Sequence, residues 1–430
     1  MANTSQQDEF KVLEKHENCG IEFISMSRVN KNRLLSKERV SLADFRQGCI
    51  GNCGLIAALA AISQRPEFSA EIAPRVEHTN KGMKLHFKMF YKGEPIVVTI
   101  DDKLPFVKPK FYERLFFGKR PSLVYARSVN DDSFYLASLF EKAVVKLVCN
   151  NNYIDSEGML SDFVLSLFSD CMISCYVLRQ TDLKQNLIDY LKREIDNKNS
   201  VVLCINPDLL FRLEDIDAGH AYVVMDYNLE HKAIKLYDPR KYPPYFYAFN
   251  TKLPLSITER ADLKKGELWI TLDQLEKRRL SINSLYPKNM HKSVFKVNSN
   301  LKQINYDRPL SGVKYACKVD IKQASTFTIN IFSYSHRVEK FTLNVFTADK
   351  EKQNVEFNGE VPRPHLYNPN QKNGNAKSIY YQSFKLQPNQ YIFKFEIEFQ
   401  KINTKVFDLM MKIGSVSECS FKEIVEENKE

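Results

Sequence analysis

The side chains that could do covalent chemistry are a cysteine and two partners placed far along the chain. Cys53 ends the glycine-rich segment Gln47-Gly-Cys-Ile-Gly-Asn-Cys53, and an alanine- and leucine-rich stretch follows it. The glycines disfavour a helix before Cys53, whereas the spacing of Leu55, Leu59 and Ile62 predicts one after it. A helix N-terminus stabilises a thiolate, which is the form of cysteine that attacks a carbonyl carbon. We therefore predict that Cys53 is a nucleophile in the first turn of a buried helix.

A nucleophilic thiol needs a base, and His220 is the best placed of the eight histidines. It follows a glycine and begins an apolar run that is typical of a strand. A third group must hold the imidazole in one tautomer. Asp238 follows the next apolar run, and it reaches the imidazole if the two runs pair as a hairpin. The sequence thus predicts His220 as general base and Asp238 as its partner.

Attack on a carbonyl also creates an oxyanion that needs hydrogen-bond donors. The side-chain amide of Gln47 and the backbone N–H of Cys53 are the candidates, because the glycine-rich turn folds Gln47 back over the cysteine. We predict that these two groups form the oxyanion hole.

The elements that must position these residues change in kind along the chain. Residues 136–147 and 183–195 have helical periodicity, and residues 84–100 predict a β-hairpin. Short apolar runs predict strands at residues 201–205, 221–225, 233–237 and 269–272, and then at 313–321, 327–334, 341–347, 379–386, 391–397 and 406–413. The expected fold class is α+β: a helix-rich part, an antiparallel sheet, and a separate β-sandwich.

Composition excludes several other classes. The 430 residues are 43% hydrophobic and 27% charged, with a net charge of +10. The basic residues are mixed with acidic ones along the chain rather than gathered in a stripe. We therefore expect a globular protein and no nucleic-acid partner. The chain has no secretory signal pattern and no long apolar run, and its nine cysteines lack compact spacing. These features favour a reducing compartment, and the expected localisation is cytoplasmic.

The motifs together resemble those of the calpain family of cysteine proteases. Residues 47–53 are similar to the family's Gln-Gly-x-Leu-Gly-Asp-Cys, and residues 219–222 match its Gly-His-Ala-Tyr. Further similar segments are Val98-Thr-Ile-Asp-Asp-Lys-Leu-Pro105, Leu139-Phe-Glu-Lys-Ala143, Gly266-Glu-Leu-Trp269 and Phe384-Lys-Leu-Gln-Pro-Asn-Gln-Tyr391. The resemblance spans roughly residues 40–420. It implies a two-lobed papain-like protease core followed by an all-β C2-like sandwich.

On this basis we predict five parts of the chain. They are a flexible leader (1–35), a helical lobe with the nucleophile (36–180), a sheet lobe with the histidine and aspartate (181–288), a C2-like β-sandwich (289–422) and a tail (423–430).

Three residues depart from the family pattern. Gly54 stands where calpains have a tryptophan, and Asp238 replaces the family's asparagine. Arg240 lies near the position of the tryptophan that wedges the cleft of resting calpains. An anionic Asp238 still orients the imidazole and favours the imidazolium.

The resemblance implies calcium as cofactor and no organic cofactor. Asp44, nine residues before Cys53, matches the family's calcium-binding aspartate, and Glu157 and Asp162 lie where a further acidic ligand is expected. No EF-hand loop pattern is present, so we expect an atypical form without a penta-EF-hand domain and without a small-subunit partner. The expected partners are protein substrates and, through the C2-like domain, anionic membrane lipid.

The implied activity is limited proteolysis by an intracellular, calcium-regulated cysteine endopeptidase. Two alternatives stay open. Gly54 and Arg240 favour a calpain-fold scaffold with impaired catalysis. An acyltransferase such as a transglutaminase also uses Cys, His and Asp, although its nucleophile lies in mid-chain.

Overall fold

The computed structural model describes most of the chain, and the structural statements below concern only those residues. They are residues 10–12, 20–26, 44–65, 71–80, 82–108, 115–116, 121–128, 135–178, 184–205, 219–240, 266–275, 280–287, 289–298, 304–305, 310–334, 338–347, 352–353, 378–400 and 409–424. Within them the fold is α+β, with more strands than helices. None of the helices in these ranges is both long and apolar enough to cross a membrane.

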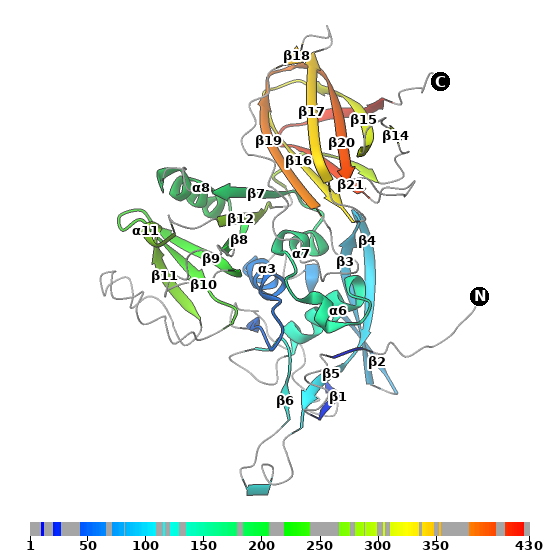
Figure 1. The fold of residues 1–430 in the computed structure, drawn as a ribbon, viewed down its shortest axis with the longest axis vertical. Coiled ribbons are helices and arrows are strands. Elements are labelled where there is room, and N and C mark those ends of the chain that lie inside the picture. Colours follow the sequence, from blue (N-terminus) through cyan, green and yellow to red (C-terminus); the bar gives the residue numbers. More distant parts are fainter. Residues whose placement is uncertain are drawn as a thin grey trace, which may run out of the picture.

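The helical lobe lies around α3, near the middle of the molecule in Figure 1. Its helices are α3 (Cys53–Ser63), α6 (Leu136–Val148), α7 (Ser161–Phe168) and the 3₁₀ helix η2 (Tyr153–Ser156). Its two antiparallel sheets are β2 (Arg75–Thr79), β3 (Gly82–Tyr91) and β4 (Glu94–Asp101), and β1 (Ile21–Ser25), β5 (Lys103–Val107) and β6 (Ser122–Leu123). Helices α6 and α7 lie between α3 and the β3–β4 hairpin, and α3 also packs against β8 (Ser200–Ile205) and β9 (His220–Asn228) of the sheet lobe.

Helix α3 has the sequence Cys-Gly-Leu-Ile-Ala-Ala-Leu-Ala-Ala-Ile-Ser, and every residue from Gly54 to Ser63 is buried. The predicted core positions Leu55, Leu59 and Ile62 are each at most 2% exposed. Burial of each of these side chains contributes about 1.5–3 kcal/mol, and the alanines between them let neighbouring elements approach closely. The prediction of a buried helix beginning at Cys53 is confirmed.

The predicted leader, residues 1–35, is wrong in part. Strand β1 lies inside it and pairs with β5 over its full length, from Ile21 opposite Val107 to Ser25 opposite Lys103. Lys11 forms a β-bridge with Asn152. Because these partners lie far along the chain, the polar composition of the first residues did not reveal them. Residues 20–26 belong to the helical lobe.

The sheet lobe contains one six-stranded antiparallel sheet in the order β11-β10-β9-β8-β12-β7. Its strands are β7 (Ile173–Leu178), β8 (Ser200–Ile205), β9 (His220–Asn228), β10 (Ala233–Tyr237), β11 (Glu267–Thr271) and β12 (Leu280–Leu285), with helices α8 (Lys184–Asp196) and α11 (Leu272–Leu275). Strands β9 and β10 pair as the expected hairpin. The predicted lobe boundary at residue 180 is wrong, because β12 pairs with both β7 and β8 and thereby draws β7 into this sheet.

The C-terminal β-region (residues 293–424) consists of two antiparallel sheets around one hydrophobic core. One sheet has β13 (Ser293–Asn298), β21 (Leu409–Ser415), β16 (Ser325–Ser333) and β19 (Ser378–Leu386). The other has β14 (Ile304–Asn305), β15 (Leu310–Ile321), β20 (Asn389–Gln400), β17 (Val338–Thr347), β18 (Lys352–Gln353) and β22 (Cys419–Ile424). The six predicted strands here are present in full or in part, whereas β13, β14, β18 and β22 were not foreseen. In Figure 1 this region stands beyond β7 and the β3–β4 hairpin.

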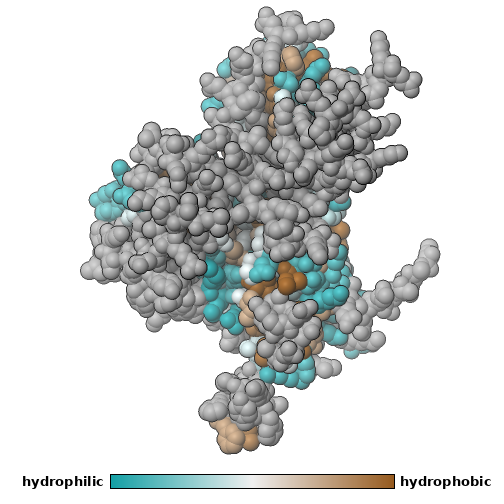
Figure 2. All heavy atoms as spheres, in the orientation of Figure 1, coloured by the Kyte–Doolittle hydropathy of each residue, from teal (hydrophilic) through white to brown (hydrophobic). Residues whose placement is uncertain are grey.

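The surface gives little further guidance on where a ligand binds. In the described part of the face drawn in Figure 2, hydrophobic residues appear as small separate spots. The functional site must therefore be sought from side chains that could do chemistry.

Candidate active site

The nucleophile segment is held by a buried carboxylate. Asn52, the residue before α3, is fully buried, and its Nδ2 donates to Glu141 Oε1 at 2.6 Å. The other oxygen of Glu141 accepts the Ala126 N–H at 2.9 Å. Because both partners lie in the helical lobe, the first turn of α3 has a fixed position. Cys53 is thereby placed as the first helical residue, half-buried at the edge of the lobe.

Two glycines are needed where this segment passes close to other backbone. A Cβ on Gly48 would lie 2.4 Å from the backbone of Tyr125, and one on Gly54 would lie 2.1 Å from the Met159 carbonyl oxygen. Such distances exclude any side chain unless the neighbouring chain moves. Residue 159 therefore occupies the space beside Cys53 that a larger residue at position 54 would need.

The sheet lobe supplies the histidine and the aspartate from neighbouring strands. His220 is the first residue of β9, and Gly219 before it has φ +72°, a conformation that glycine adopts readily. Asp238 directly follows β10, which pairs with β9. His220 Nε2 and Asp238 Oδ1 lie 2.8 Å apart, and the two residues are 3% and 1% exposed. The hairpin therefore brings the predicted pair into a buried hydrogen bond.

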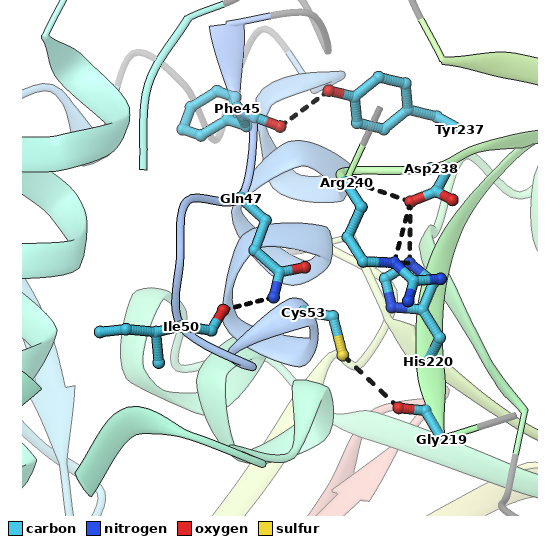
Figure 3. Close-up of polar contacts among 9 residues, drawn as sticks. All are labelled: Phe45, Gln47, Ile50, Cys53, Gly219, His220, Tyr237, Asp238 and Arg240. Atoms are coloured by element: carbon cyan, nitrogen blue, oxygen red, sulfur yellow. Dashed lines mark hydrogen bonds and ion pairs between the residues drawn. The ribbon is translucent and has the colours of Figure 1, made fainter. Parts of the chain in front are cut away.

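Three contacts join the two lobes at the site. The Tyr237 hydroxyl donates to the Phe45 carbonyl at 2.8 Å, and the Gln47 backbone N–H donates to the Pro239 carbonyl at 2.8 Å. Cys53 Sγ lies 3.9 Å from the Gly219 carbonyl oxygen. Figure 3 shows the sulfur of Cys53 directed toward the strand that carries the imidazole, with the carboxylate on the far side of the ring. The structure thus brings together the cysteine, histidine and aspartate that the sequence predicted.

The electrostatics of the site favour a charged Cys53–His220 pair. Burial by itself raises the pKa of Cys53, but the hydrogen bond and charge of His220, the Ala221 N–H and the charge of Arg240 hold it below the usual thiol value. Burial lowers the pKa of His220, but the charge and hydrogen bond of Asp238, together with Cys53, hold it above the usual imidazole value. A lowered thiol pKa beside a raised imidazole pKa stabilises thiolate and imidazolium together.

Asp238 stays ionised in spite of its burial. Burial raises its pKa, but the charge and hydrogen bond of His220 and the neighbouring Arg240 outweigh this, so the pKa lies below the usual carboxyl value. The Arg240 backbone N–H donates to Asp238 Oδ1 at 2.7 Å. No described residue forms a hydrogen bond with the buried Asp238 Oδ2. One carboxylate oxygen thus serves both the imidazole and the following turn.

Arg240 makes a contact that the sequence did not reveal. Its Nε lies 3.0 Å from His220 Nε2 and 3.8 Å from Asp238 Oδ1, and its side chain is about one-third exposed. The sequence marked Arg240 only as a departure from the calpain pattern. The sequence also did not reveal that Glu141, in the segment Leu139–Ala143, holds the residue before the nucleophile.

Gln47 lies beside Cys53, but its amide has a different partner from the one expected. Its side chain is 7% exposed, and its Nε2 donates to the Ile50 carbonyl within the same loop. Its side-chain oxygen has no hydrogen-bond partner among the described residues. One amide hydrogen of Gln47 therefore holds the loop.

The three predicted calcium ligands are not gathered into one site. Asp44 is fully buried and accepts a hydrogen bond from Ser128 Oγ at 2.8 Å, whereas Asp162 Oδ1 accepts the N–H of its own neighbour Phe163. Glu157 lies against Gly51. In the described ranges, no group of three or more His, Cys, Asp or Glu side chains could hold a metal ion. Asp44, Glu157 and Asp162 therefore do not form one cluster of ligands, and calcium binding stays a prediction.

Comparison with known proteins leads to the same family as the sequence motifs. The chain is 27% identical to calpain-8 of Mus musculus over 268 residues, which are 57% of this chain and 36% of the relative. It is 30% identical to a calpain of Schistosoma mansoni over 177 residues (40% of this chain, 21% of the relative) and 26% identical to the calpain-1 catalytic subunit of Rattus norvegicus over 212 residues (48% and 28%). The aligned parts thus span only about a fifth to a third of these relatives. The sequence profile of the calpain family cysteine proteases matches residues 6–241, more than half of the chain, and the chain belongs to that family.

Proposed function

We propose that this protein is an intracellular cysteine endopeptidase that cleaves protein substrates through Cys53, His220 and Asp238. The observation that carries the proposal is the meeting of the two lobes at the site. Cys53 begins a buried helix of one lobe, and His220, held at 2.8 Å by Asp238, faces it from the other.

The residues have distinct parts in the proposed reaction. The Cys53 thiolate attacks the scissile carbonyl, and the amide of Gln47 and the N–H of Cys53 donate to the oxyanion that forms. The His220 imidazolium gives its proton to the departing amine, which leaves an acyl group on the sulfur. The neutral imidazole then takes a proton from water, whose oxygen attacks the thioester and releases Cys53. Asp238 keeps the imidazole oriented through both steps.

We propose limited proteolysis at exposed, unstructured segments of folded proteins. A site at the junction of two lobes is reached by an extended chain more readily than by a helix or a paired strand.

The test is cleavage of a casein-like substrate by the wild type and by Cys53→Ala. We expect cleavage by the wild type and none above background by Cys53→Ala, with His220→Ala reduced by a factor on the order of 10³. Cys49→Ala is the matched control, because Cys49 is an exposed thiol in the same loop, and it should cleave at the wild-type rate. Equal cleavage by wild type and Cys53→Ala contradicts the proposal.

Calcium regulation stays a prediction. Asp44, Glu157 and Asp162 do not form one cluster, so a calcium site would need other oxygen ligands as well. A calcium titration of the melting temperature measures it directly, because a ligand that binds only the folded state raises that temperature. A rise in melting temperature with a matching rise in cleavage rate supports regulation. An unchanged melting temperature up to millimolar calcium contradicts it.

For the C-terminal β-region we propose a C2-like fold that attracts anionic lipid. Its two sheets and single core are consistent with such a domain. Co-sedimentation of the full chain with vesicles containing phosphatidylserine, compared with neutral phosphatidylcholine vesicles, tests the lipid partner. Equal sedimentation with both kinds of vesicle contradicts it.

A further inference from the structure

Arg240 approaches the same imidazole nitrogen that Asp238 binds. Its Nε lies 3.0 Å from His220 Nε2, which is itself 2.8 Å from Asp238 Oδ1. The turn that places it is fixed, because the Arg240 N–H donates to Asp238 Oδ1 and the Pro239 carbonyl accepts the Gln47 N–H. The guanidinium is therefore placed beside the imidazole by the chain that follows Asp238.

The two contacts on Nε2 compete for one proton. If Nε2 carries the proton, it donates to the Asp238 carboxylate and cannot accept from Arg240. If Nε2 is unprotonated, its lone pair faces a carboxylate oxygen at 2.8 Å, which is repulsive. The protonated form is thus preferred, and Arg240 acts on this group through its charge rather than through a hydrogen bond to the ring.

A count of charges shows what that charge does. A thiolate and an imidazolium alone sum to zero, and an asparagine as third member, as in the family pattern, keeps that sum. Asp238 adds one negative charge at a residue that is 1% exposed, with one oxygen lacking a hydrogen-bond partner among the described residues. An uncompensated buried charge costs several kcal/mol. Arg240 adds the one positive charge that returns the sum to zero.

We propose that Arg240 is a positioning residue that balances the charge of Asp238, so that Asp238 and Arg240 together replace the neutral third member of the family's triad. The proposal deepens the proposed function and rests on it, since it concerns the same Cys53–His220 pair.

Few other titratable groups face this pair. Among the described residues, and besides Asp238 and Arg240, they are Tyr222 from β9 and Cys204 from β8. The ring of Tyr222 meets the imidazole edge-on with centroids 4.6 Å apart. Burial raises the pKa of Cys204 to about 12, so this thiol stays neutral. Near neutral pH the titrating groups of the pair are therefore Cys53 and His220, with Asp238 and Arg240 as fixed charges. Glu141, whose pKa burial raises to about 7, lies behind Asn52 and is the same in all the variants compared.

The sign of each charge change is fixed. Loss of a positive charge makes nearby acids weaker, so Arg240→Gln raises the pKa of both Cys53 and His220. Loss of a negative charge makes them stronger, so Asp238→Asn lowers both. In the double variant the two effects oppose each other, and the pKa values return toward those of the wild type.

The experiment is the pH profile of Cys53 alkylation by iodoacetamide in the full chain, followed by mass spectrometry of the peptide that contains Cys53. This neutral reagent reports the thiolate without any substrate. We expect Arg240→Gln to move the apparent thiolate pKa up by roughly 0.5–1 unit and Asp238→Asn to move it down, since a nearby charge shifts a pKa by about this much or more. Arg240→Lys, which keeps the charge, should stay near the wild type.

Peptide cleavage supplies the second readout. Asp238→Asn leaves a cation beside a neutral partner, so we expect the larger loss of kcat/KM in this variant. Asp238→Asn with Arg240→Gln should recover at least about fivefold over Asp238→Asn alone, within the usual range of coupling between contacting residues. Arg193→Gln, an exposed arginine on α8, is the matched control and should leave the profile unchanged.

Several results would overturn the proposal. One is an unchanged thiolate pKa in Arg240→Gln. Another is an equal pKa shift in Arg240→Lys and Arg240→Gln at matched melting temperatures. The third is a loss of kcat/KM in the double variant that equals the product of the two single losses. Faster alkylation in Arg240→Gln without a pH shift would mean that Arg240 only shields the sulfur, which also contradicts it. If no substrate is cleaved but the profiles move as expected, the proposed protease activity fails while the charge balance stands.

Discussion

Two buried carboxylates, Asp238 and Glu141, hold the two sides of the candidate site, and they differ in charge partner. Asp238 has His220 and Arg240 beside it, which lower its pKa. For Glu141, burial raises the pKa to about 7. Hydrogen bonds from the Ala126 N–H and the Asn52 amide lower this pKa but do not outweigh the burial. Glu141 therefore titrates near neutral pH, and it accepts a hydrogen bond from Asn52, the residue that precedes the nucleophile helix.

We predict that Glu141→Gln removes a pH dependence of stability. The folded-state pKa of Glu141, about 7, lies above its unfolded value of about 4.3, so its stabilising contribution is present below pH ~4 and lost as pH rises through 7. The full change is on the order of 3 kcal/mol. Urea unfolding of both proteins between pH 5 and 8 measures it. Free-energy curves of wild type and variant that run parallel over this range contradict the prediction.

The sequence located the reacting side chains because each lies in a short local pattern. Glycines followed by an alanine-rich stretch predict a helix start at Cys53, and a glycine before an apolar run predicts a strand start at His220. The partner of the Gln47 amide and the position of the Arg240 guanidinium depend on side-chain packing in three dimensions. Spacing along the chain carries no signal for either.

The nucleophile helix depends on a close approach of backbone to backbone at its first turn. A Cβ at Gly54 would meet the Met159 carbonyl oxygen at 2.1 Å, and the Gly158 N–H donates to the Gly51 carbonyl at 2.9 Å. Residues 158–159 thus pack directly on the segment that carries Cys53. The glycine that replaces the family's tryptophan is required by this local packing.

We predict that Gly54→Ala destabilises the protein, although alanine is the better helix former by about 1 kcal/mol. The added methyl group forces residue 159 or the helix start to move, at a cost of about 1–3 kcal/mol, and the shift of Cys53 lowers kcat/KM. Urea unfolding and the cleavage assay measure the two effects. Gln64→Ala, at the exposed end of the same helix, should change stability by less than about 0.5 kcal/mol. A Gly54→Ala variant as stable as the wild type contradicts the packing argument.

Strand pairing is the part of the fold that sequence reasoning recovered least well. β1 pairs with β5 and β7 pairs with β12, and in each case the partner lies far along the chain. The sequence analysis predicted none of these four strands, and where an apolar run does predict a strand it does not indicate which strand lies beside it. The hairpins β3–β4 and β9–β10 were predicted correctly because a short turn joins each pair.

The C-terminal β-region is joined to the rest of the molecule by specific polar contacts. The Asn330 side chain accepts the Ile173 N–H at 2.8 Å and donates to the Ile173 carbonyl at 2.7 Å. Asp170 pairs with Lys412, which is 2% exposed, at 2.9 Å, and also with Lys296. Because residues 170–173 lead into β7, these contacts connect the β-region to the sheet that carries His220.

We predict that Asp170→Ala weakens this junction. It leaves the Lys412 ammonium buried without its carboxylate, and such a loss costs about 3–5 kcal/mol. Calorimetry should show that the β-region unfolds at a lower temperature than in the wild type. Lys296→Ala, which removes a partner of the same carboxylate that is about one-third exposed, should cost about 1 kcal/mol or less. Equal effects of the two substitutions contradict the assignment of Lys412 as the buried partner.

The central claim is that Cys53 is a thiolate activated by His220 across the junction of the two lobes. Labelling with a peptidyl epoxide, followed by peptide mapping, tests it most directly. We predict one equivalent of label on Cys53 and none on the exposed Cys49, with labelling lost in Cys53→Ala and slowed in His220→Ala. Equal labelling of Cys49 and Cys53, or a rate unaffected by His220→Ala, would contradict the account.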